Sequence, residues 1–134
     1  PWGRPDMAMY IFAKKILEGK QIKVFNKGKM KRDFTFIDDI VEGIVESIKR
    51  NYKCEIFNLG NNRSEKLMDM ISMIEKCLGK SAKIKFDNMQ LGDVKNTCAD
   101  IEYSEKKLNF NPKTNLEDGV IKFISWYKLY HNIK

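Results

Sequence analysis

The chain has 134 residues, of which 43% are hydrophobic and 32% charged, with a formal net charge of +7. This length suits one domain, and this composition supports a packed core and excludes a disordered chain. No apolar run approaches the ~20 residues of a membrane helix and no signal peptide is visible, so we expect no membrane partner. Three scattered cysteines and one histidine argue against a disulfide framework or a metal site, and this cysteine usage predicts a cytoplasmic protein. The basic charge is interleaved with acidic residues, so we expect no nucleic-acid partner.

The first half of the chain predicts two helices separated by two short strands. Apolar residues recur at helical spacing over residues 7–18, with Asp6 as the N-cap and Gly19 as the stop. Residues 22–25 and 34–36 are predicted to be strands. From Asp38 to residue 50, apolar residues again recur on one face and predict a strongly amphipathic helix.

The second half continues the alternation of helices and strands. Residues 55–59 and 83–86 predict strands, and Ser64 is expected to cap a helix that ends at Gly79. A short helix is predicted over 100–108, and Thr114 with Glu117 forms the capping-box pattern before a last helix. The order α-β-β-α-β-α-β-α-α, with short connections, predicts an α/β (α+β-like) layered structure.

Arg32 is the strongest candidate for binding an anion. It follows Lys29 and Lys31 and precedes a predicted strand, which would hold its guanidinium in place. This rigid fork of donors fits a phosphate or a carboxylate bidentately. The residues alone leave open a surface ion pair between Arg32 and Asp33 or Asp38, which would contribute only ~0–1 kcal/mol.

Other polar residues admit both a functional and a structural interpretation. Arg4 at a helix entrance completes an anion pocket or is a solvated terminal arginine. Asp93 follows Gly92 in a loop, where it accepts hydrogen bonds from sugar hydroxyls or forms a turn. The adjacent carboxylates Asp38 and Asp39 are better explained as helix-capping residues than as a catalytic pair.

The chain shows no catalytic or cofactor-binding motif of its own. Tyr10 and Tyr103 each have a lysine four residues later, a spacing that could lower a phenol pKa, but such pairs are frequent by chance in a lysine-rich chain. No glycines are close enough to form GxGxxG or a phosphate-binding P-loop, and there is no GxSxG. We therefore expect the isolated chain to contain no catalytic residue and to be inactive.

Several blocks of the sequence nevertheless resemble one family along essentially the whole chain. These blocks are PWGRPDMA at 1–8, KRDFTFIDDIVEGI at 31–44, FNLGN at 57–61, MQLGDV at 89–94, Ala99–Asp100, and a closing pattern at 112–127. Together they resemble the UDP-glucuronate 4-epimerases, which are extended short-chain dehydrogenase/reductase enzymes of the NAD-dependent epimerase/dehydratase family. The RDFTxIDD block marks the nucleotide-sugar group, and WGRPDM is more specific to the glucuronate branch.

The resemblance implies that residues 1–134 are the C-terminal nucleotide-sugar-binding portion of such an enzyme, with NAD and the catalytic residues on a Rossmann half outside this sequence. Arg32 matches the family arginine that contacts the diphosphate. Asp93 matches the aspartate at the ribose hydroxyls, and Val24 and Phe25 match the strand against which uracil lies.

The implied reaction interconverts UDP-glucuronate and UDP-galacturonate through a 4-keto intermediate. Gln90 stands where related UDP-galactose epimerases carry a second arginine, and Arg4 could replace that contact or serve the sugar. Two alternatives stay open: another nucleotide-sugar enzyme of the group, such as a decarboxylase, a 4,6-dehydratase or a neutral-sugar 4-epimerase, and a non-catalytic nucleotide-binding module.

In this family, residues 37–60 pack on the Rossmann half. Without that half, an apolar helix face and an edge strand would be uncovered. We therefore expect a homodimer, or a chain that self-associates or exchanges elements with a neighbouring copy.

Overall fold

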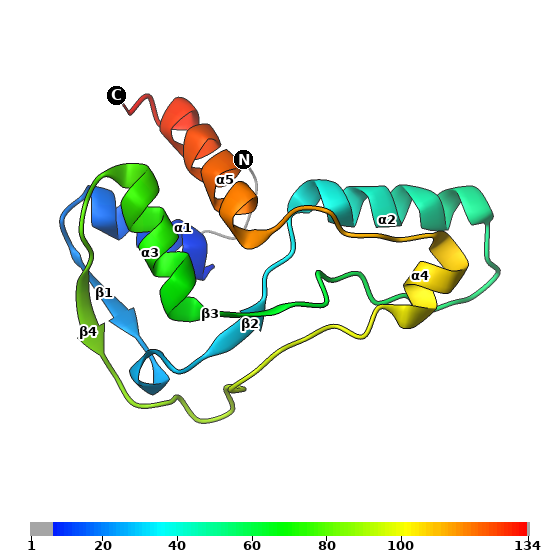
Figure 1. Cartoon of the computed structure of the whole chain (residues 1–134), viewed down its shortest axis with the longest axis horizontal. Coiled ribbons are helices and arrows are strands. Elements are labelled where there is room, and N and C mark those ends of the chain that lie inside the picture. The colour runs from blue at the N-terminus through cyan, green and yellow to red at the C-terminus, as the bar shows by residue number, and fades with distance from the viewer. Residues whose placement is uncertain (1–6, 134) are drawn as a thin grey trace.

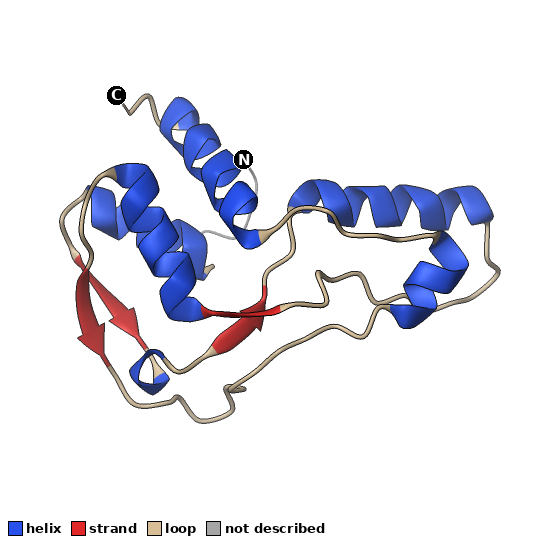
Figure 2. Ribbon diagram, in the orientation of Figure 1, coloured by secondary structure: helices blue, strands red, loops and turns tan. Residues whose placement is uncertain are grey.

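The computed structural model describes residues 7–133, and they form the predicted mixed α/β structure (Figures 1 and 2). In chain order, the elements are α1 (Ala8–Leu17), β1 (Gln21–Val24), the short 3-10 helix η1 (Asn26–Gly28), β2 (Lys31–Asp33), α2 (Ile37–Arg50), β3 (Ser64–Lys66), α3 (Leu67–Leu78), β4 (Lys83–Phe86), α4 (Glu102–Leu108) and α5 (Leu116–Tyr130). Helices dominate, and each strand is at most four residues long.

The main core lies where α1, α3 and α5 meet the parallel pair β1–β4. The strands pair in register, Ile22 opposite Ile84 and Val24 opposite Phe86, and α3 contacts both α1 and α5. As the sequence predicts, α3 buries one face, formed by Met70, Ile71, Ile74 and Leu78. Complete burial of an aliphatic side chain such as these contributes ~1.5–3 kcal/mol, so this core holds the helices against the strands.

Strand β2 joins parts of the chain that are distant in sequence. It pairs antiparallel with β3, placing Arg32 opposite Glu65. On its other side, the N–H of Lys31 donates to the carbonyl of Lys95 at 2.9 Å, and the N–H of Thr97 donates to the carbonyl of Lys31 at 3.3 Å. The segment around residues 93–97 is therefore held beside β2.

Helices α2 and α4 lie apart from the main core, at the other end of the molecule (Figure 1). A small second core of Ile101, Leu108 and Phe110 lies here, with Phe57 and Leu59 packed against it. The predicted apolar stripe of α2 is largely uncovered, because Val41, Ile44, Val45 and Ile48 are exposed and only Ile40 is half-buried. Ile37, at the start of the helix, is exposed as well. This confirms the expected uncovered helix face.

Two predicted strands are absent from the described part of the chain. Residues 34–36 are not a strand, because the ladder partners of β2 end opposite Asp33. Residues 55–59 also form no strand. No described segment pairs with them, and Ile56 is 87% exposed. A strand requires hydrogen-bonding neighbours, and an aromatic or alternating pattern cannot provide them.

The helix starts also differ from the predictions. Ser64 lies in β3 instead of capping α3, which begins at Leu67 without a side-chain cap. The cap of α5 is Asn115, whose side chain accepts from the N–H of Asp118 at 2.8 Å, instead of Thr114. The predicted cap Asp6 lies outside the described residues.

Asp39 has a tertiary role in place of the predicted capping role. It is buried in the first turn of α2, where Phe36 occupies the N-cap position. Its two oxygens accept the backbone N–H groups of Lys113 and Thr114 at 3.2 and 3.1 Å. The carboxylate therefore anchors the segment that leads into α5 onto α2, although its negative charge at a helix start also suits the helix dipole.

Candidate functional site

A cavity of about 360 Å³ opens between α1, the end of β1 and β2. Its volume lies within the range of small-molecule sites, and its walls combine apolar and charged groups as such sites do. The lining residues are Ala8, Ile11, Phe12, Lys15, Lys23, Phe25, Met30, Arg32, Phe34, Leu67 and Asp93.

The periodicities of the helix and the strand place these side chains around the same cavity. On α1, the lining positions 8, 11, 12 and 15 have the i, i+3, i+4, i+7 spacing of one helical face. Around β2, the lining positions 30, 32 and 34 alternate, as residues on one face of a strand do. The extended backbone that follows β2 therefore keeps Phe34 on the same side as Arg32, although residue 34 belongs to no strand.

Arg32 and Asp93, both predicted site residues, meet at this cavity. Nη2 of Arg32 lies 2.8 Å from Oδ1 of Asp93, and both side chains are about three-quarters buried, with 24% and 29% exposed. Nη1 of Arg32 donates to the carbonyl of Lys31 at 2.9 Å and to that of Lys95 at 3.4 Å. These three bonds fix the plane of the guanidinium, so Arg32 pairs with Asp93 and not with the nearby acids Asp33 or Asp38.

Both charged groups keep unused hydrogen-bonding capacity. A guanidinium has five N–H donors. Within residues 7–133, the Nε–H and one Nη2–H of Arg32 have no acceptor. Oδ1 of Asp93 also accepts the N–H of Val94 at 2.9 Å, whereas Oδ2 has no partner in the same range. The pair therefore presents free donors for an anion beside a free acceptor for a hydroxyl.

Nearby residues set the conformation of the loop that carries Asp93, and a hydrogen bond to β2 holds its far end. Gly92 adopts a φ of +81°, a conformation that favours glycine because it lacks Cβ, and no atom would meet a Cβ there. The N–H of Asp93 donates to the carbonyl of Gln90 at 3.2 Å and closes the turn. The loop's far end is attached to β2, because the N–H of Asp33 donates to Oγ1 of Thr97 at 3.0 Å.

Asp33 is a structural residue that the sequence analysis did not single out. Its Oδ1 accepts the N–H of Asn61 at 2.9 Å, and its Oδ2 accepts those of Asn62 at 3.0 Å and Ala99 at 2.8 Å. One carboxylate thus binds the 60–62 loop and the segment after Asp93 to β2. The acidic residue beside Arg32 was visible in the sequence, but its three donors are 28, 29 and 66 positions away.

The other predicted substrate residues are placed differently. Phe25 lines the cavity, half-buried. The side chain of Val24 is fully buried in the main core, and Val24 is not among the lining residues. Gln90 is exposed and is not among the lining residues. Arg4 lies outside the described residues.

Two lysines at the cavity were not predicted to be site residues. Lys15 belongs to the lining face of α1, and Lys23 lies two positions before Phe25, on the same side of β1. The available signal was this spacing relative to Phe12 and Phe25. It was hidden because lysines are abundant throughout the chain.

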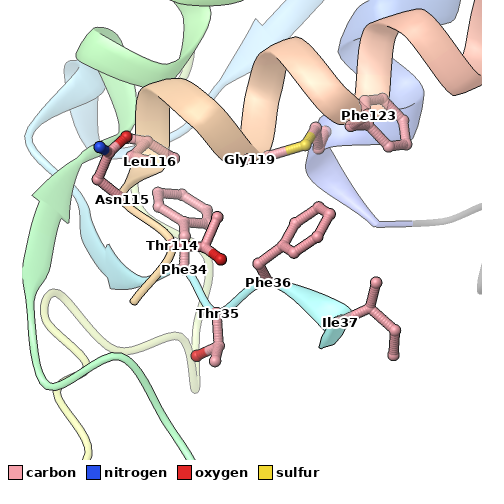
Figure 3. Close-up of a pocket in the computed structure, with 10 residues that line it drawn as sticks. Phe34, Thr35, Phe36, Ile37, Thr114, Asn115, Leu116, Gly119 and Phe123 are labelled. Carbon is pink, nitrogen blue, oxygen red and sulfur yellow. The ribbon is translucent and has the colours of Figure 1, made fainter. Parts of the chain in front are cut away.

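A second cavity, of about 200 Å³, lies between the segment after β2 and the start of α5 (Figure 3). Figure 3 shows the rings of Phe34 and Phe36 beneath the first turns of α5, near Leu116 and Gly119. Phe34 lines both cavities. None of the residues that line this second cavity is charged, so it is a poorer site for an anionic ligand.

The two tyrosine–lysine pairs lack the geometry of a proton-transfer site. The hydroxyl of Tyr103 donates to Glu55 at 3.0 Å, and this hydrogen bond raises the pKa of Tyr103, the opposite of the shift that a catalytic phenolate needs. The ammonium of Lys107 lies over the ring, 5.8 Å from its centroid. The Tyr10 hydroxyl lies 3.1 Å from Nε2 of His131, in an aromatic cluster at the C-terminal end of α5.

Within residues 7–133, no group of His, Cys, Asp or Glu side chains is arranged to hold a metal ion. In the same part of the chain, none of the helices is both long enough and apolar enough to cross a bilayer.

Comparison with known proteins relates these features to a family. The NAD dependent epimerase/dehydratase family matches residues 1–60. An uncharacterized protein of Methanocaldococcus jannaschii is 53% identical over 126 residues, covering 94% of this chain and 39% of that protein. A UDP-glucuronate 4-epimerase of Thermodesulfobacterium geofontis is 41% identical over 129 residues, covering 96% of this chain and 40% of that enzyme.

A solved structure shows the same fold. The crystal structure of a mutant UDP-glucuronic acid 4-epimerase from Bacillus cereus, in complex with UDP-4-deoxy-4-fluoro-glucuronic acid and NAD, matches with a TM-score of 0.88 and 36% identity. The match covers 97% of this chain and 42% of that enzyme. The chain thus spans about 40% of the length of the relatives it matches and corresponds to the C-terminal portion of such structures.

Proposed function

Because the chain belongs to the NAD dependent epimerase/dehydratase family, we propose that it is the UDP-sugar-binding part of an epimerase that interconverts UDP-glucuronate and UDP-galacturonate. The 36–41% identity to enzymes named for this reaction supports glucuronate as the sugar. Catalysis is assigned to the N-terminal portion that the longer relatives possess, and the 4-keto intermediate would form there.

The observation that carries the proposal is the meeting of Phe25, Arg32 and Asp93 in one cavity. They come from three segments, and each has chemistry that suits a different part of a nucleoside diphosphate. The ring of Phe25 offers an apolar surface for the base. The free N–H donors of Arg32 suit a diphosphate oxygen. The free oxygen of Asp93 accepts a ribose hydroxyl.

The ion pair between Arg32 and Asp93 serves this task by preorganisation. Both side chains already have a fixed direction before the nucleotide arrives, so less side-chain entropy is lost when it binds. The backbone carbonyls of Lys31 and Lys95 hold the guanidinium from the other side. Consequently, diphosphate and ribose are bound at neighbouring points on β2 and the 89–97 loop.

The residues of this chain do not fit NAD. Dinucleotide sites of this class use a glycine-rich turn between a strand and a helix, and the eight glycines of the sequence form no such motif. We therefore assign NAD to the N-terminal portion of the whole protein. The role of this chain is to bind and orient the nucleotide end of the substrate.

The first test is UDP binding by the 134-residue chain, measured by isothermal titration calorimetry. We expect binding to the wild type and at least about a tenfold loss in Arg32→Met, because charge-assisted hydrogen bonds are removed. Arg63→Met removes an exposed loop arginine and should bind UDP as the wild type does. Equal affinity of Arg32→Met and Arg63→Met would contradict the assignment of Arg32.

The second test concerns the sugar and requires the whole protein. Epimerisation of UDP-glucuronate, with little activity on UDP-glucose, is the expected result. Release of carbon dioxide or loss of water from the sugar would assign the protein to a decarboxylase or a dehydratase of the same family. UDP binding without turnover of any UDP-sugar would favour a non-catalytic nucleotide-binding module.

A further inference from the structure

We infer that Lys15 and Lys23 supply the net positive charge that offsets the diphosphate, whereas Arg32 mainly fixes its direction. This inference rests on the proposed function, because it concerns the same cavity and a nucleoside diphosphate as the ligand. It assigns a role to two residues that neither the motifs nor the resemblance identifies.

Four charged side chains line the cavity. They are the cations Lys15, Lys23 and Arg32, and the carboxylate Asp93. Because Asp93 lies 2.8 Å from Arg32, the two charges largely cancel for an anion that approaches from farther away. The remaining charge of +2 comes from the lysines, and it equals in magnitude the −2 charge of a diphosphate esterified at both ends.

The placement of the lysines supports this role. Both line the cavity, Lys15 from α1 and Lys23 from β1, so they lie on the wall formed by α1 and β1, whereas Arg32 lies on β2. Within residues 7–133, neither ammonium group has an acidic partner within 4 Å. Lys20, by contrast, is held by Glu18 at 2.8 Å.

Electrostatics sets the expected size of the effect. With a separation of ~6 Å and an effective dielectric constant of ~40–80, one lysine changes the affinity for a doubly charged ligand about 10- to 100-fold. The effect decreases with added salt, because the Debye length falls from about 10 Å at 0.1 M to about 3 Å at 1 M. The apolar walls and the short hydrogen bonds of Arg32 are less sensitive to salt.

The test measures UDP and uridine binding to variants of the 134-residue chain at low and high salt. Lys15→Met and Lys23→Met should each weaken UDP binding at low salt by at least about 10-fold and leave uridine binding unchanged. The loss should shrink at ~1 M salt. Lys15→Arg and Lys23→Arg retain the charge and should bind UDP as the wild type does.

The control is Lys14→Met, which removes the same charge from an exposed position on α1 that does not line the cavity. A loss in Lys14→Met equal to that in Lys15→Met would overturn the inference, since the effect would then reflect net charge alone. Unchanged UDP binding in both methionine variants, or arginine variants as weak as the methionine variants, would also overturn it and leave the proposed function intact. Failure of the wild type to bind UDP would overturn both.

Discussion

Replacing Asp33 with asparagine is expected to destabilise the chain strongly, although the two side chains have nearly the same shape. The carboxylate accepts three backbone N–H groups, from Asn61, Asn62 and Ala99, at 2.8–3.0 Å. An amide presents only one acceptor oxygen. Its NH₂ group would face one or two of these N–H donors, so donors would oppose each other whichever way the amide is turned.

The magnitude follows from the bonds lost. A hydrogen bond to a charged acceptor contributes about 1.5–3 kcal/mol, and two of the three are lost if the amide oxygen replaces Oδ1. The other orientation loses one bond and leaves one N–H opposed. Water can reach Asn62, which is exposed, and will compensate in part. We therefore expect the free energy of unfolding to fall by about 2–4 kcal/mol in Asp33→Asn.

The assay is urea unfolding followed by circular dichroism, at low protein concentration so that self-association does not contribute. Asp38→Asn is the matched control: it removes the same charge from an exposed position five residues away and should change stability by less than about 0.5 kcal/mol. If Asp33→Asn differs from that control by less than ~0.5 kcal/mol, the hydrogen bonds to Asp33 do not stabilise the chain. Because the same bonds hold the segment that follows Asp93, UDP binding should weaken in parallel.

Three further predictions concern other parts of the chain. Asp39→Ala removes the acceptor for the N–H groups of Lys113 and Thr114, so the free energy of unfolding in urea should fall by ~1–3 kcal/mol. A fall no larger than in Asp38→Ala would show that Asp39 does not anchor this segment. The double variant Ile44→Lys and Ile48→Lys charges the exposed face of α2, so light scattering should show less self-association than in the wild type with unchanged helical content; a monomeric wild type at high concentration would contradict this. Burial, and secondarily Tyr10, raise the pKa of Tyr127, so its stabilising contribution is complete below the unfolded-state pKa of about 10 and is lost as pH rises through the higher folded-state value. Stability should therefore fall more steeply above pH ~10 in the wild type than in Tyr127→Phe, and parallel pH profiles would refute this.

Local sequence was sufficient for the elements whose stability depends on one buried face. The apolar positions of α3 predicted the residues that it buries, from Met70 to Leu78, and Gly79 ends it in the left-handed conformation. The alternation in 83–86 predicted β4. Helical and strand periodicities are properties of neighbouring residues, so they can be read without knowing what covers them.

Strand pairing and caps depended on distant residues and were predicted less well. The aromatic run 34–36 has strand propensity, but its backbone lacks a partner, whereas Lys31–Asp33 has one on each side. Asp39 was expected to cap a helix, and it instead binds two N–H groups more than 70 positions away. A local motif cannot indicate whether a tertiary donor is nearer than the local one.

The sequence by itself determined the residue types of the site, which include an arginine able to bind an anion and a loop aspartate. It also determined the spacing that puts Lys15 on the same face of α1 as Phe12. Only the tertiary structure decided that Arg32 pairs with Asp93, which of the 25 basic residues line the cavity, and that Asp33 holds the two loops together. The physical reason is that ion pairs and backbone hydrogen bonds depend on the distance between two groups in space and not on their separation along the chain. These contacts therefore form only when β2 is packed against β3 and the 93–97 segment.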